Sequence, residues 1–189
     1  MVAPSPKRPL AFTLRSQGRL ARVLHSPCRI SLAADIANLA PALRPKTEEF
    51  VAIWDTGATG SVITQRVIDK CELKTIGVAK VHGVQGESIT SRHLVNILLP
   101  NTVTITDVTV TLGNLPAQAD VLIGMDVIGL GDFAVSNFKG ETVFTFRCPS
   151  IACTDYVQES LTVAAKLARA TAGPGGFSGG HQKGSRHRK

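Results

Sequence analysis

Residues 49–61, Glu-Phe-Val-Ala-Ile-Trp-Asp-Thr-Gly-Ala-Thr-Gly-Ser, decide the fold of this chain. The compact apolar run that ends at Trp54 predicts a buried strand. Asp55, Thr56 and Gly57 end that strand and place a carboxylate on a tight turn, where backbone N–H groups can point at it. Gly57 lets the neighbouring backbone approach the carboxylate without a Cβ in the way. The alternative is an ordinary surface turn, since aspartate and glycine are common turn residues.

Short strand-like segments surround this stretch on both sides. Strands are expected at residues 29–38, 80–95, 95–99, 103–112, 119–124, 133–136 and 142–146. Gly83 and Gly86 bracket a hairpin tip, and residues 64–71 predict a short helix with Thr64 as its N-cap. Many short strands with one or two short helices predict an all-β fold, a small barrel or sandwich.

Composition and charge divide the chain into four parts. The 189 residues are 43% hydrophobic and 19% charged, which excludes wholesale disorder. The net charge of +7 is concentrated at the ends, because residues 1–29 and 161–189 each hold six Lys/Arg and no acid. We expect a flexible basic arm over 1–27, a folded domain over 28–150, an amphipathic helix over 151–171 and a disordered Gly-rich tail over 172–189.

The sequence gives no sign of a metal site, a disulfide framework or a membrane span. The four cysteines are too scattered for a disulfide scaffold or a zinc knuckle, and the apolar runs fall short of the roughly 20 residues that a membrane span needs. A cytoplasmic protein without metal or organic cofactor is therefore expected. The basic ends predict solubilising tails, with nucleic-acid contact as the alternative.

Three segments in a fixed order resemble the retropepsin-like aspartic proteases, the family of retroviral and retrotransposon proteases with cellular and bacterial relatives. Residues 51–61 resemble the family's active-site segment, and residues 119–126, Ala-Asp-Val-Leu-Ile-Gly-Met-Asp, resemble its paired apolar run ending in glycine. Residues 81–87 lie where the family carries its flap hairpin. The resemblance covers about residues 28–150 and is strongest to the retrotransposon and bacterial forms. It implies a closed-barrel-like fold and cleavage of peptide bonds.

The resemblance also implies a homodimer, because only one Asp-Thr-Gly occurs in the chain. The mechanism needs two carboxylates that share one proton, an arrangement for which aspartic proteases are the standard example. Asp55 would meet Asp55 of a second copy, with Thr56 bonded across the dimer axis, Gly57 contacting the carboxylates and Ala58 lying along the substrate. The flap residues Gly83, Val84, Gln85 and Gly86 would close over an extended peptide.

Several features leave alternatives open. Trp54 replaces a smaller aliphatic residue and is either a core residue or a wall of the cleft. Asp126 is expected to cap the turn that follows it rather than to act as a second catalytic acid. The extensions at both ends put the family's dimer interface in doubt. A catalytically silent module for dimerisation or peptide binding is the alternative to a protease, because a fold does not fix a function.

Overall fold

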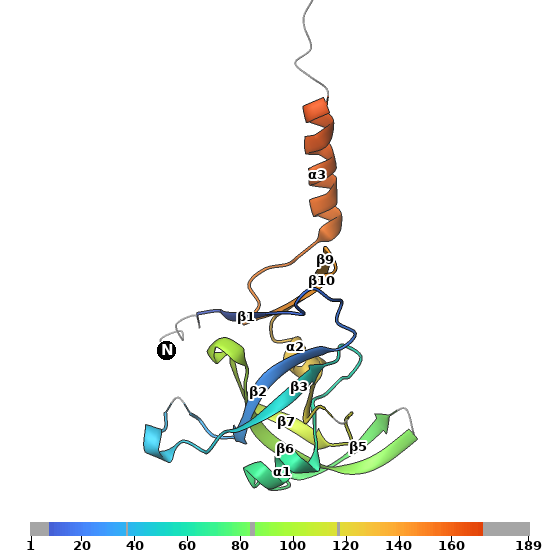
Figure 1. Cartoon of the computed structure of the whole chain (residues 1–189). Helices are drawn as coiled ribbons and strands as arrows, with labels where there is room; N and C mark the ends of the chain where they lie inside the picture. The colour runs from blue at the N-terminus through green and yellow to red at the C-terminus, as the bar shows by residue number, and fades with distance from the viewer. Residues whose placement is uncertain (1–7, 37, 84–85, 117, 172–189) are drawn as a thin grey trace, which may run out of the picture. The chain divides into compact units, whose positions relative to one another are not determined.

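The computed structural model describes residues 8–36, 38–83, 86–116 and 118–171. The chain divides into one unit that ends at Ala152 and a second that begins at Cys153. The first unit contains all of the strands and two of the α-helices, and the second contains the helix α3 (Tyr156–Thr171). Figure 1 shows the elements of each unit.

A seven-stranded sheet forms most of the first unit. Its strands are β2 (Leu24–Leu32), β3 (Glu48–Trp54), β4 (Val62–Ile63), β5 (Gly77–Gly83), β6 (Gly86–Leu98), β7 (Thr104–Leu112) and β8 (Val121–Ile123). They lie in the order β2-β3-β8-β4-β7-β6-β5, and β2 pairs with β6 as well, so the sheet closes on itself with β5 outside the ring. The prediction of an all-β fold with few short helices is confirmed.

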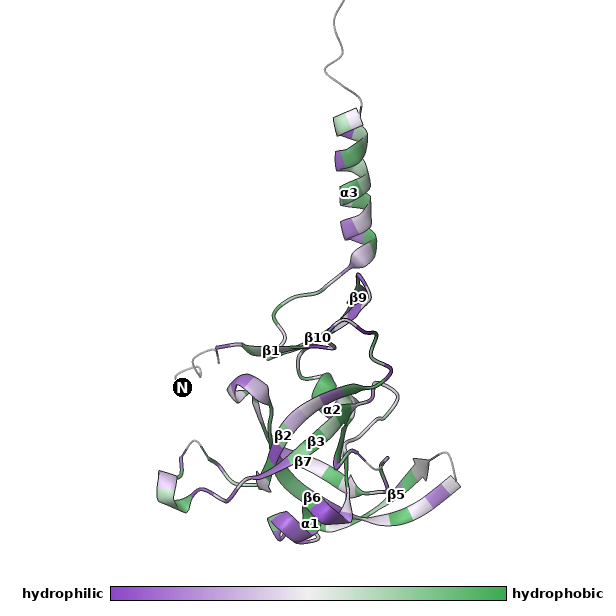
Figure 2. Cartoon of the chain, viewed as in Figure 1, coloured by the Kyte–Doolittle hydropathy of each residue, from purple (hydrophilic) through white to green (hydrophobic). Residues whose placement is uncertain are grey.

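The core lies inside this closed sheet and follows the alternation of the strands. On β3, Phe50, Ala52 and Trp54 are buried while the residues between them are exposed or half-buried. Alternate residues of a strand point to opposite faces, so one face of β3 is apolar from Phe50 to Trp54. Figure 2 shows hydrophobic positions, in green, along β2, β3 and β6. The core fixes where β3 ends, and therefore where Asp55 lies.

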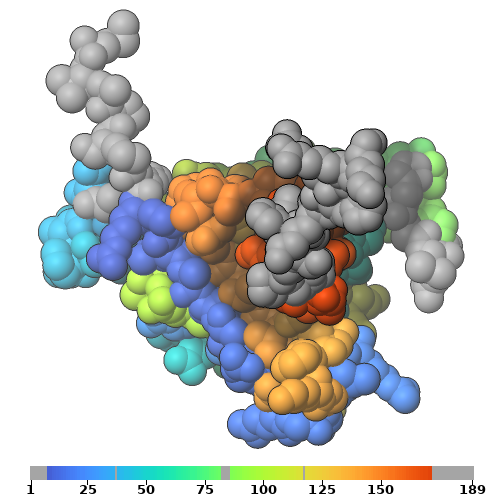
Figure 3. All heavy atoms as spheres, turned by 90° about the horizontal axis from the view of Figure 1, so that it is seen from above, coloured from blue at the N-terminus to red at the C-terminus, as the bar shows by residue number. Residues whose placement is uncertain are grey.

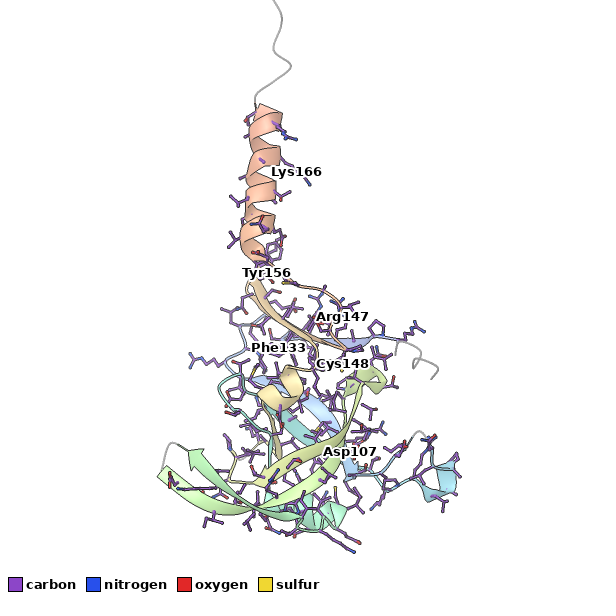
Figure 4. All side chains as sticks on the ribbon, turned by 180° about the vertical axis from the view of Figure 1, so that it is seen from behind. Asp107, Phe133, Arg147, Cys148, Tyr156 and Lys166 are labelled. Atoms are coloured by element: carbon purple, nitrogen blue, oxygen red, sulfur yellow. The ribbon has the colours of Figure 1, made fainter. Side chains whose placement is uncertain are left out.

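A second sheet of three antiparallel strands packs on the core. Its order is β1 (Leu10–Arg15), β10 (Glu141–Cys148) and β9 (Asp132–Phe138). Phe144 and Phe146 of β10 are buried, and Phe133 of β9 stacks on Trp54 with ring centroids 5.8 Å apart. Figure 4 labels Phe133 and Arg147 on these strands. The sheet closes the aromatic end of the core.

The expectation of a flexible basic arm over residues 1–27 is wrong for its described part. Residues 10–15 form β1, and the first residues of β2 also lie within this span. Phe12 is only 6% exposed and packs against Trp54 and Phe144. The burial of Phe12 explains why residues 10–15 form a strand, because an aromatic ring in a core stabilises the strand that carries it. Residues 1–7 lie outside the described residues.

The helices are short in the first unit and longer in the second. α1 (Gln65–Cys71) follows the prediction closely, and α2 (Met125–Ile128) is a single turn. Thr64 occupies the N-cap position of α1, but its buried hydroxyl makes no hydrogen bond. Short 3₁₀ turns lie at Pro41–Leu43 and Pro100–Thr102. In the part of the chain that is described, no helix has the length and apolar character to cross a membrane.

Candidate active site

Asp55 lies at the end of β3 with its side chain exposed. The backbone N–H of Asp55 donates to the carbonyl of Ile123 at 3.0 Å, which continues the parallel pairing of β3 with β8. The Gly57 N–H donates to the Asp55 Oδ1 atom at 2.8 Å. A Cβ on Gly57 would lie 3.2 Å from that same oxygen, so the close approach favours glycine here. The carboxylate is oriented by backbone and open to solvent.

Trp54 anchors the strand immediately before this carboxylate. Its side chain is 6% exposed and lies among four phenylalanine rings, and its Nε1–H donates to the Ser26 Oγ at 2.9 Å. A buried indole whose N–H is bonded has a fixed position. Of the two alternatives left open by the sequence, the structure shows a core residue.

Two loops cross directly behind Asp55. The Met125 N–H donates to the Ala58 carbonyl at 2.8 Å, and the Asp126 N–H donates to the Thr59 carbonyl at 3.2 Å. Gly124 lies at the crossing, where a Cβ would come within 2.7 Å of the Gly60 carbonyl group. The Asp55 loop is therefore held by the segment that follows β8.

Ser61 and Asp126 lock this crossing with side-chain bonds. Ser61 is 1% exposed; its N–H donates to the Asp126 Oδ2 at 2.9 Å and its hydroxyl donates to Oδ1 at 2.8 Å. The Ser61 Oγ also accepts from the Gly124 N–H at 3.1 Å. Asp126 also accepts from the Val127 N–H at 3.0 Å, but it lies within α2, whose N-cap position is Gly124, and not ahead of the turn as expected. Its bonds to Ser61 could not be predicted, because 65 residues separate the two in sequence.

Asp120, just before β8, is held by an ion pair. Arg66 of α1 places its Nη1 2.7 Å from both carboxylate oxygens, and Asp120 is 9% exposed. The Thr64 N–H donates to the Asp120 carbonyl at 3.0 Å. This pair ties α1 to the strand beside β3. Like Asp126, Asp120 is engaged in holding the frame.

A groove of about 740 Å³ lies between the Asp55 loop and the hairpin of β5 and β6. Its lining comes from residues 57–62, from Ala79, Lys80 and Val81 of β5, and from part of β7. The hairpin is formed as predicted, with Gly83 paired to Gly86 at its end. Val84 and Gln85, the predicted tip, lie outside the described residues.

The two buried cysteines, Cys28 and Cys71, are poor nucleophiles. Burial raises the pKa of the Cys28 thiol to about 12 and that of Cys71 to about 11. Thiols with such values are uncharged at neutral pH, and the thiolate is the reactive form. Within the described residues, no group of three or more His, Cys, Asp or Glu side chains could hold a metal ion.

Comparison with known proteins bears directly on these features. Residues 46–127 match the model of a family described as aspartyl protease. The resemblance to retropepsin-like aspartyl proteases is confirmed. The matched span begins just before β3 and ends within α2, so it contains the Asp55 loop, the hairpin and the Gly124 crossing.

Two solved structures are similar to parts of this chain. One is a retropepsin-like aspartic protease from Rickettsia conorii, with 11% identity and a TM-score of 0.44, covering 75% of this chain and 96% of that one. Another is the retroviral protease-like domain of Ddi1 from Leishmania major, with 16% identity and a TM-score of 0.38, covering 61% of this chain and 82% of that one. A comparison with curated proteins found no significant match.

Proposed function

We propose that this protein is an aspartic endopeptidase whose catalytic dyad is formed by Asp55 from each of two copies. The observation that carries the proposal is the state of the Asp55 carboxylate. It lies exposed at the end of a buried strand and receives one backbone N–H, and the residues that follow it, 57–62, line the groove between the loop and the hairpin. This arrangement suits a group that must contact water and substrate.

The other two acids on the flanks of β8 support the proposal of a second copy. Asp120 is paired with Arg66, and Asp126 is bonded to Ser61 and to the Val127 N–H. A dyad needs two carboxylates close enough that one is protonated while the other is ionised. Since both of these acids are engaged elsewhere, a second Asp55 is the fitting partner, and a twofold axis brings two copies of one residue together.

The chemistry would then proceed without metal or cofactor. The ionised member of the Asp55 pair accepts a proton from the attacking water, and the protonated member donates its proton to the oxygen of the scissile carbonyl, which gives a tetrahedral diol. The diol then returns a hydroxyl proton to the dyad as its C–N bond breaks, and the other aspartate gives its newly gained proton to the leaving amine. The Gly57 N–H would orient each carboxylate, and the exposed Thr56 would bond across the dimer axis. Ala58, which is half-buried, would lie along the peptide, under the hairpin tip formed by Gly83 to Gly86.

The test is cleavage of an unfolded protein mixture between pH 4 and 8, with wild type and Asp55→Asn in parallel. We expect cleavage by the wild type, greatest on the acid side because the dyad must retain one proton, and none by the variant. Sedimentation should show both proteins as dimers. Cleavage by Asp55→Asn would overturn the mechanism. A folded, dimeric wild type that cleaves nothing would instead favour a silent peptide-binding or dimerisation module.

A further inference from the structure

The segment that joins β1 to β2, residues 16–23, ends where β2 begins its pairing with the last residue of β3. In the antiparallel pairing of β2 with β3, Leu24 is opposite Trp54 and His25 is opposite Ile53. Directly opposed residues in such a pair have Cα atoms about 5 Å apart. If the same register continues by one residue, the last residue of the 16–23 segment lies opposite Asp55.

This segment forms one wall of a cationic pocket of about 460 Å³. The charged lining consists of Arg15, Arg19, Arg22 and His25, with no acidic residue among the lining side chains. The remaining lining is largely apolar, with Leu14 and Phe144 on the strands of the small sheet. An apolar floor with a cationic rim suits a ligand with a short aliphatic stem and a negative end.

Two of the three arginines that line the pocket form no ion pair with a carboxylate in the described part of the chain. Arg15 donates to Glu141 at 3.2 Å and is thereby partly neutralised. In contrast, Arg19 and Arg22 are exposed, and across the described part of the chain no carboxylate pairs with either one. An arginine guanidinium presents several donors in a plane that matches a carboxylate.

The wall is held in place by Thr142 of β10. The Thr142 N–H lies 3.2 Å from the Arg19 carbonyl and 2.9 Å from the Ser16 Oγ, and the Ala21 N–H donates to the Thr142 hydroxyl at 2.9 Å. Thr142 is itself 3% exposed. Figure 3 shows the blue chain after β1 reaching the β9–β10 hairpin, drawn in orange. A wall fixed in this way reduces the ordering cost of binding.

We propose that this pocket is a specificity site that takes the side-chain carboxylate of a glutamate in the substrate, a few residues from the bond that is cut. The role as a specificity site rests on the proposed protease function, whereas binding of glutamate can be measured without cleavage. Glutamate fits better than aspartate, because its two methylene groups reach across the apolar floor before the carboxylate meets Arg19 and Arg22.

Binding can be measured without cleavage on the full-length Asp55→Asn protein. The probe is a fluorescein-labelled octapeptide of alternating valine and glutamate, compared with the same peptide containing glutamine, by fluorescence anisotropy. We expect roughly tenfold tighter binding of the glutamate peptide, the size of one charge-assisted hydrogen bond. Added salt should reduce the ratio, since the arginines are exposed.

A matched pair of variants separates the pocket from overall charge. Arg19→Gln with Arg22→Gln should bring the ratio between the two peptides close to one. Lys166→Gln with Arg169→Gln removes the same charge from exposed positions of α3 and should preserve the ratio. Equal binding of both peptides by the parent protein, or the same ratio in both double variants, would overturn the proposal.

Three further measurements test whether the pocket instead binds nucleic acid or a second copy of the chain, and whether it affects cleavage. Tighter binding of an eight-nucleotide oligothymidine, lost in the Arg19/Arg22 variant, would assign the pocket to nucleic acid and overturn the proposal. Conversion of that variant to a monomer would make the pocket a contact between copies, which would also overturn it. In active wild type, product ends from a peptide library should be enriched in glutamate; cleavage without enrichment would refute the pocket and leave the protease. Glutamate-selective binding without any cleavage would support the pocket and contradict the protease function.

Discussion

Asp55 and Asp126 follow two neighbouring parallel strands, yet their carboxylates are used differently. Trp54 of β3 is paired with Ile123 of β8, so the two aspartates leave the same edge of the sheet. The Asp55 carboxylate accepts one bond, from the Gly57 N–H. The Asp126 carboxylate accepts three, from the Ser61 N–H, the Ser61 hydroxyl and the Val127 N–H.

The difference shows that the ends of two neighbouring strands can supply both a candidate reactive carboxylate and a carboxylate that holds the surrounding loops. A carboxylate with several fixed donors holds chain segments together, whereas one with a single backbone donor stays open to another ligand. The residue type and its place after an apolar strand are common to both aspartates. The number of bonds separates a structural acid from a candidate catalytic one.

Disrupting the contact between the Asp55 loop and the segment that follows β8 should have the largest effect on stability. Gly124→Ala would place a Cβ 2.7 Å from the carbonyl carbon and oxygen of Gly60, which the backbone can relieve only by separating the loops. We expect the free energy of unfolding to fall by about 3 kcal/mol. Urea denaturation measures this change.

Gly60→Ala is the matched control for that variant. A Cβ on Gly60 meets nothing within 4 Å, and its φ lies outside the left-handed region. We expect a change below about 0.5 kcal/mol, as for an ordinary surface position. Equal losses in the two variants would show that the crossing at Gly124 is not tightly packed.

Exchanging the two aspartates for alanine in turn tests the comparison itself. Asp126→Ala leaves the buried Ser61 N–H and hydroxyl without their acceptor, so we expect a loss of about 2 kcal/mol in the free energy of unfolding. Asp55→Ala should change that quantity by less than about 0.5 kcal/mol. The measurement is again urea denaturation of both proteins. Similar losses would mean that Asp55 also serves the frame.

A third aspartate sharpens the comparison through its pH dependence. Asp132 accepts from the Ser150 hydroxyl at 2.5 Å, the Ile151 N–H at 3.0 Å and the Arg147 guanidinium, and these bonds lower its pKa from 3.8 to about 2. A lowered pKa in the folded state stabilises the fold above about pH 4, and this contribution is lost as the pH falls towards 2.

Asp132→Asn should therefore be less stable than wild type at pH 7, with a difference that shrinks between pH 4 and pH 2. Thermal unfolding at a series of pH values measures it. Because the site is at the surface, this is the smallest of the expected effects. A difference that stays constant down to pH 2 would show that the bonds to Asp132 do not depend on its charge.

Local patterns predicted the elements nearest to Asp55 well. The apolar run of β3, the helix α1 and the glycine-bracketed hairpin each depend on residues close together in sequence. In contrast, β1 was missed although Leu10, Phe12 and Leu14 alternate with other residues in the period of a strand. The nearby prolines and basic residues favoured a loose arm, and the partner strand β10 lies about 130 residues further along the chain.

The sequence by itself determined a β-rich chain with one Asp-Thr-Gly turn after a buried strand, because these features follow from short-range patterns of apolar residues and glycine. Only the tertiary structure decided that Asp126 supports Ser61, that Gly124 has no room for a side chain, and that Arg19 and Arg22 line a pocket together with Thr142 and Phe144 of β10. Each of these contacts joins segments far apart in the chain. Such contacts depend on strand order and register, which no local pattern contains.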